Sequence, residues 1–127
     1  MSGNDLVLPL FVTEERDEPV AIPSMPEQFR WPVERLVEKI IEWRSLGLRA
    51  FALFPHLDAS KKNEDGKEIL NPDSLVYRAA RRIKEEAPDI ALIGDLALDP
   101  YTSHGHDGIL SDDGRVDNDL TVEALCK

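Results

Sequence analysis

Acidic and imidazole side chains gathered between positions 95 and 108 are the residues of this sequence best suited to chemistry. The run holds Asp95, Asp99, His104, His106 and Asp107. Carboxylate and imidazole groups together can bind a divalent cation, and oxygen-rich ligation favours magnesium over zinc. The same residue types also occur in glycine-rich polar turns that bind nothing, so the residue types alone leave both interpretations open.

The elements that must position this run alternate between strand and helix. Short apolar segments at 6–12, 48–54 and 90–96 predict three buried strands. Apolar residues recur near the 3.6-residue period at 32–46 and 71–87, which predicts two amphipathic helices. A short last helix is predicted to start with a cap at Asn118 or Asp119. This alternation indicates a parallel α/β chain.

Prolines and one glycine set the predicted limits of these elements. The prolines of segment 14–32 exclude a long helix there. Gly47 stands where the first long helix should end. Pro9 predicts an edge position or an irregularity in the first strand, and Pro55 is expected to end the second strand.

A loop of about 20 residues follows the third predicted strand and contains most of the 95–108 run, and connections of that length are usually functional. In parallel α/β proteins ligands bind at the carboxyl ends of the strands. No glycine-rich phosphate loop follows any strand, which weakens a nucleotide-binding interpretation. An open doubly wound sheet and part of a (β/α)8 barrel both fit the pattern, since a complete barrel needs about 250 residues.

Composition narrows the class of protein and its partners. The 127 residues carry a net charge of −10, with 42% hydrophobic and 31% charged residues, which indicates a globular domain and argues against nucleic acid as a partner. No apolar run approaches the roughly 20 residues of a membrane span. The N-terminus lacks the pattern of a signal peptide. With one cysteine, Cys126, a cytoplasmic location without membrane partners is expected.

Residues 95–108 resemble the metal-loop signature of the porphobilinogen synthases, also called 5-aminolaevulinate dehydratases. In the zinc-dependent branch of that family, cysteines occupy the positions of Ala97, Asp99 and Asp107. This sequence is similar instead to the aspartate-rich branch that uses magnesium. Further stretches match in the family's order, at 6–13, 22–26, 53–55, 71–73 and 116–119.

The resemblance implies a (β/α)8 barrel, usually an octamer. Its activity would be that of a lyase of haem and tetrapyrrole biosynthesis, which condenses two 5-aminolaevulinate molecules to porphobilinogen. The family's two Schiff-base lysines lie beyond Lys127, so the chain is expected to be catalytically incomplete by itself. Asp95 would orient or charge-balance the substrate amine, and Ser103 would support it. Asp99, His106 and Asp107 are the candidate metal ligands, with magnesium preferred over zinc.

Three functions stay open at this point. The first is the N-terminal part of a magnesium-type porphobilinogen synthase: one domain over 1–127, a partial barrel of about three parallel strands with two to three helices. The second is a non-catalytic partial barrel that forms a homo-oligomer or docks on a full-length homologue. The third is a small metal-binding module. His56, just after the second predicted strand, could line the mouth of the barrel, but it is expected to face solvent in a loop. The surface lysines are expected to be Lys39, Lys61, Lys62, Lys67, Lys84 and Lys127.

Overall fold

The computed structural model describes all of residues 1–127 and divides them into two compact units. The sheet unit comprises Met1–His56 and Leu75–Asp95. The loop unit comprises Leu57–Ser74 and Leu96–Lys127. None of the helices has the length and apolar character that crossing a membrane requires. The prediction of a single domain over 1–127 stays a prediction.

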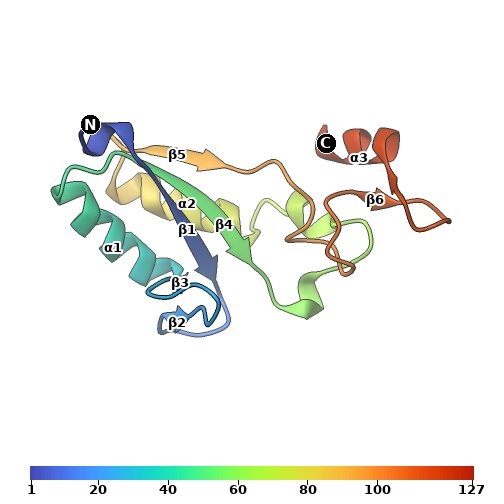
Figure 1. Cartoon of the computed structure of the whole chain (residues 1–127), viewed down its shortest axis with the longest axis horizontal. Helices are drawn as coiled ribbons and strands as arrows, with labels where there is room; N and C mark the ends of the chain where they lie inside the picture. Colours follow the sequence, from blue (N-terminus) through green and yellow to red (C-terminus); the bar gives the residue numbers. More distant parts are fainter. The chain divides into compact units, whose positions relative to one another are not determined.

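The sheet unit is built on five strands in the order β2-β3-β1-β4-β5 (Figure 1). Parallel pairing joins β1 to β3 and β4, and β4 to β5, which confirms the parallel α/β prediction. The short strand β2 pairs antiparallel with β3. The prediction missed β2 and β3 because each is too brief, among prolines, to show a periodic pattern. The bounds are β1 (Val7–Thr13), β2 (Val20–Ala21), β3 (Phe29–Pro32), β4 (Ala50–His56) and β5 (Ala91–Gly94).

Two helices, α1 (Val33–Ser45) and α2 (Leu75–Glu86), lie on one face of this sheet (Figure 1). Both confirm the predicted amphipathic segments. Gly47 follows α1 with a φ of 101°, the backbone conformation that favours glycine after a helix. A single 3-10 turn, η1 (Gly3–Asp5), precedes β1.

The core of the sheet unit lies between the helices and the sheet face that they cover. Apolar side chains at the helical period meet alternate residues of β1 and β4. Full burial of each large apolar side chain contributes about 1.5–3 kcal/mol. The core residues are Leu10, Val12, Leu36, Val37, Ile40, Phe51, Leu53, Leu75, Ala79 and Ile83.

The opposite face of the sheet is open within this unit. Val7 of β1 pairs with Ala50 of β4, and Ala50 pairs with Ala91 of β5, so these residues share one face. Val7 is 50% exposed, and Ile93 on the same face is 46% exposed. One helix-covered face and one open apolar face are the expected features of a barrel wall.

Pro9 and Pro55 both lie in strands, at points where the strand has a neighbour on one side only. β1 is the middle strand of the five, so the prediction of an edge position for this strand is wrong. Pairing of β1 with β3 starts only at Phe11, so at Pro9 the strand is paired with β4 alone. Pairing of β4 with β5 stops at Leu53. The prediction that Pro55 ends the strand is therefore wrong, because a proline without an amide donor is tolerated where one side is unpaired.

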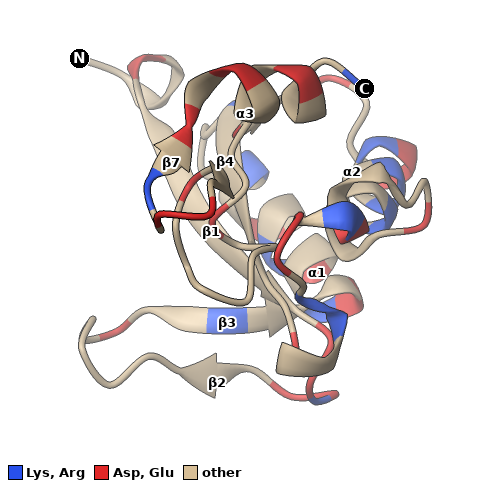
Figure 2. Cartoon of the chain, turned by 90° about the vertical axis from the view of Figure 1, so that its right-hand side faces the viewer, with Lys and Arg blue, Asp and Glu red and all other residues tan.

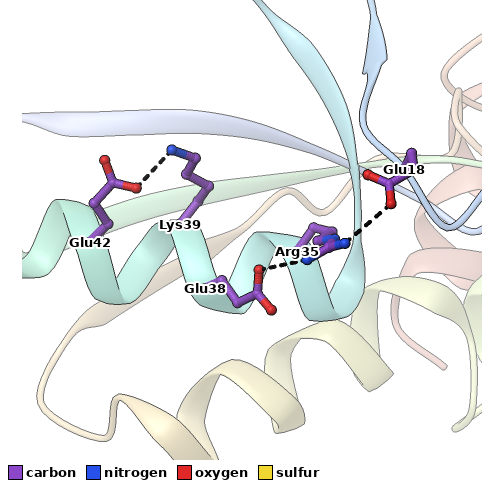
Figure 3. A network of polar contacts seen from close by, with 5 residues as sticks. All are labelled: Glu18, Arg35, Glu38, Lys39 and Glu42. Carbon is purple, nitrogen blue, oxygen red and sulfur yellow. Dashed lines mark hydrogen bonds and ion pairs between the residues drawn. The ribbon is translucent and has the colours of Figure 1, made fainter.

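Ion pairs cover the exposed side of α1 (Figure 3). Arg35 contacts Glu18 and Glu38 at 3.2 Å each, and Lys39 contacts Glu42 at 2.7 Å. The hydrogen bonds that Arg35 donates to the carboxylates of Glu18 and Glu38 raise the pKa of Arg35. Figure 2 shows that α2 also carries both signs of charge. These pairs are exposed, so we expect them to contribute little to stability.

The loop unit contains short elements only. They are η2 (Ala59–Lys61), η3 (Lys67–Leu70), the antiparallel pair β6 (Ile109–Leu110) and β7 (Val116–Asp117), and α3 (Asn118–Leu125). Asp117 caps α3 by accepting a hydrogen bond from the Leu120 amide at 3.0 Å. The predicted cap at Asn118 or Asp119 was therefore placed too late.

Candidate functional site

Asp95 follows β5 directly, at the carboxyl end of the parallel strands. Gly94 pairs with Leu53, which places Asp95 level with Phe54. The side chain of Asp95 is exposed and makes no hydrogen bond or ion pair. A carboxylate in that state is available to a cationic group such as an amine.

A histidine and a glutamate meet at the same end of the sheet. His56 Nε2 lies 3.1 Å from Glu15 Oε1, and both side chains are 33% exposed. The Glu15 amide donates to Thr13 Oγ1 at 3.2 Å, and Thr13 is the register partner of His56. The expectation that His56 faces solvent in a loop was wrong, because β4 extends through Pro55 and includes it.

The 96–108 loop, in the loop unit, is closed by its own polar groups. Asp107 Oδ1 accepts a hydrogen bond from the Leu98 amide at 2.6 Å. Thr102 Oγ1 donates to the His106 carbonyl at 2.8 Å. Leu98 and Thr102 are almost completely buried. These two contacts join the start and the end of the loop and set its shape.

A turn formed by residues 63–67, which the sequence analysis did not identify, contacts this loop. The Asn63 amide donates to the Tyr101 carbonyl at 3.2 Å, and the Ser103 amide donates to the Asn63 carbonyl at 3.0 Å. An Asn followed three residues later by Gly66 is a turn signal that was available. Nothing in the sequence indicated which segment the turn would contact.

The predicted metal ligands Asp99, His106 and Asp107 are all exposed and all belong to this one loop. The structure nevertheless contains no group of three or more His, Cys, Asp or Glu side chains placed to hold one ion. One oxygen of Asp107 already accepts the Leu98 amide. The three donors therefore do not form a three-ligand site in this conformation, and magnesium binding stays a prediction.

None of the six lysines is buried, which confirms that all six are surface residues. Lys84 Nζ donates to the carbonyls of Pro88 and Ile90 at 2.8 Å each. Lys67 lies 2.6 Å from Asp65, and that hydrogen bond raises its pKa. A Schiff-base lysine needs a desolvated amine, and none of the six lysines is buried.

A cavity of about 690 Å³ in the sheet unit lies between the segment after β1 and the helices α1 and α2. Arginine and carboxylate side chains line most of it, and several pair with one another, such as Arg82 with Glu34 at 3.2 Å. None of the predicted site residues lies in it. The cavity is therefore a charged groove on the helix-covered side of the sheet rather than part of the candidate site.

Comparison with known proteins relates the whole chain to one family. The profile of the delta-aminolevulinic acid dehydratase family matches residues 1–127. The chain is 41% identical over 127 residues to the enzyme of that name from Bradyrhizobium diazoefficiens, covering 100% of the chain and 36% of the relative. It is 42% identical over 129 residues to the chloroplastic one from Oryza sativa subsp. japonica, covering 100% of the chain and 30% of the relative.

One solved structure is similar over nearly all of the chain. It is delta-aminolevulinic acid dehydratase (porphobilinogen synthase) from Toxoplasma gondii ME49 in complex with the reaction product porphobilinogen. The TM-score is 0.95 at 46% sequence identity, over 99% of this chain and 36% of that one. The likeness confirms the predicted fold class, part of a (β/α)8 barrel. The chain spans about a third of the length of these relatives.

Proposed function

The chain belongs to the delta-aminolevulinic acid dehydratase family, and we propose that it forms one side of an active site that condenses two 5-aminolaevulinate molecules to porphobilinogen. The observation that carries the proposal is the close likeness to a dehydratase solved with porphobilinogen bound. The chain covers 36% of that protein, so the reaction itself is part of the proposal.

Asp95 and Ser103 are the residues proposed to meet the substrate. Aliphatic amines are largely protonated near neutral pH, and Asp95 is an exposed carboxylate without a partner at the carboxyl end of β5. It can hold the substrate ammonium and fix the orientation of the molecule. Ser103 is exposed, and its hydroxyl can donate one further hydrogen bond.

Schiff-base formation is not assigned to any residue of this chain. All six lysines are at least partly exposed, and the hydrogen bond to Asp65 raises the pKa of Lys67, which favours its charged form. A charged ammonium has no lone pair with which to attack a ketone. The part of the reaction proposed for residues 1–127 is therefore binding and orientation.

Magnesium is proposed as the metal of the aspartate-rich loop. Magnesium keeps several waters and often takes only one or two protein carboxylates, and the loop contains no cysteine that would favour zinc. Calorimetric titration of the chain with magnesium and with zinc tests this. We expect heat with magnesium that is lost in the double variant D99N/D107N. The absence of heat with either metal at millimolar concentration would reject the proposal.

The catalytic proposal is tested with a chimera in which residues 1–127 replace the matching part of the Bradyrhizobium diazoefficiens relative. We expect the chimera to form porphobilinogen from 5-aminolaevulinate and the 127-residue chain by itself to form none. In the chimera, D95N should lower kcat/KM strongly, whereas E38Q on the exposed side of α1 serves as the matched control. A folded chimera without activity would contradict the proposal.

A non-catalytic partner role is the second candidate, because one face of the sheet is open and apolar. Val7 and Ile93 are each about half exposed on that face. Such surfaces favour association with another chain, either a second copy or a full-length homologue. Sedimentation of the 127-residue chain distinguishes these roles: a folded monomer at high concentration would count against homo-oligomer formation.

A further inference from the structure

Asn63 connects two loops of the loop unit through its backbone. Its amide donates to the Tyr101 carbonyl at 3.2 Å, and its carbonyl accepts from the Ser103 amide at 3.0 Å. Together these bonds make an isolated parallel bridge between Asn63 and Thr102. Ser103, which we propose to meet the substrate, is therefore hydrogen-bonded directly to Asn63.

The side chain of Asn63 fixes the turn from which these bonds are made. Its Oδ1 accepts hydrogen bonds from the amides of Asp65 at 3.1 Å and Lys67 at 3.0 Å. The Gly66 amide also donates to the Asn63 carbonyl at 3.4 Å. A carboxylate at position 63 can accept the same two side-chain bonds, whereas an alkyl group cannot.

The turn also packs closely against the 96–108 loop. Gly66 has a φ of +60°, and a Cβ there would lie 3.3 Å from the side chain of Leu98 and 3.5 Å from that of Tyr101. His104 Nε2 lies 3.2 Å from the Glu64 carbonyl. Backbone bonds and close packing therefore act together, and the turn sets the position of the loop.

We propose that Asn63 is a positioning residue for porphobilinogen formation, because its side chain shapes the turn that holds Ser103 in place. This inference rests on the proposed function and extends it to a residue outside the 95–108 run. Asn63 acts through Ser103 rather than on the substrate. Small misplacements of a site residue can lower turnover substantially without unfolding the protein.

The positioning itself is tested by amide hydrogen exchange in the 127-residue chain. In N63A we expect the Ser103 amide to exchange about 10-fold faster, the equivalent of one lost hydrogen bond. N63D should keep the original rate, because its carboxylate still accepts from both amides. The matched control is N71A, which removes an acceptor for the Asp73 amide at 3.0 Å in the same unit. An unchanged Ser103 rate in N63A would overturn the proposal.

The role in the reaction is tested by the same three variants in the chimera. We expect N63A to lower kcat about 10- to 100-fold at an unchanged melting temperature, and N63D and N71A to keep kcat. A merely structural role would lower the melting temperature and the folded fraction but not kcat per folded molecule. Full kcat in N63A would overturn the assignment. An inactive parent chimera would instead defeat the proposed function, and hydrogen exchange would then decide the positioning alone.

Discussion

In the sheet unit, the apolar side chains of Leu36, Phe51 and Ile83 are buried completely. In the loop unit, the polar residues Thr102 and Thr121 are among the buried residues. The sheet unit is thus stabilised mainly by apolar burial spread over many side chains. The loop unit buries fewer apolar side chains, among them Leu57, Leu98 and Tyr101, and hydrogen bonds of Asp107 and Thr102 close its 96–108 loop. We therefore expect the sheet unit to tolerate changes of its polar surface residues. The 96–108 loop, in contrast, can lose its shape when one hydrogen-bonding group is removed.

The largest expected effect is the loss of an aromatic side chain from the core of the sheet unit. Phe51 is fully buried, so F51A should lower the free energy of unfolding by about 3–5 kcal/mol. Chemical denaturation followed by Trp43 fluorescence measures this, since the Trp43 and Phe51 rings lie 6.4 Å apart. The control is Y77A on α2, where the side chain is 41% exposed. Equal losses in both variants would contradict the apolar core described here.

In the loop unit, the next largest loss of stability is expected from a change of the buried polar residue Thr102. T102V removes the hydrogen bond to the His106 carbonyl in a buried position, which should cost about 1–3 kcal/mol of local stability. Amide exchange at Leu98 and Ser103 should accelerate, while the amide of Leu53 in the sheet unit should not change. T102S keeps the hydroxyl and is the control. Equal acceleration at Leu53 would mean that the two units open together.

A backbone change in the sheet unit should have a smaller effect. Gly47 has a φ of 101°, so G47A should destabilise the chain by about 1 kcal/mol through backbone strain. The denaturation midpoint measures the loss. Gly94 does not have a positive φ, and a Cβ at that position would meet no other atom within 4 Å. G94A is therefore the matched control. A G47A midpoint equal to that of G94A would argue against the described helix end.

The smallest expected effect on stability comes from the turn between β6 and β7. Hydrogen bonds from Arg115 and Ser111 hold the pKa of Asp113 below its ordinary value. A lowered folded pKa gives stability that is present above the unfolded value of about 3.9 and lost as the pH falls through the folded pKa. Titration of the Asp113 carboxyl carbon followed by NMR measures this pKa. R115Q should raise this pKa and R30Q, in the sheet unit, should not.

The helices and the long strands could be predicted because their information is local. The helical period of 32–46 and the apolar runs at 6–12 and 48–54 each indicate which side chains should face a core. The same pattern placed the third strand at 90–96, whereas β5 ends at Gly94, directly before Asp95. The strands β2 and β3 could not be predicted, since two to four residues give too short a pattern and their pairing depends on β1.

The sequence by itself determined the fold class, the order of the elements and the acidic run that follows β5. Only the tertiary structure decided that His56 meets Glu15, that Asp107 accepts the Leu98 amide, and that Asn63 holds Ser103. The physical reason is that hydrophobic periodicity records which face of an element is buried. Contacts between loops distant in the sequence depend on turn geometry and backbone pairing, which leave no periodic signal in the residues.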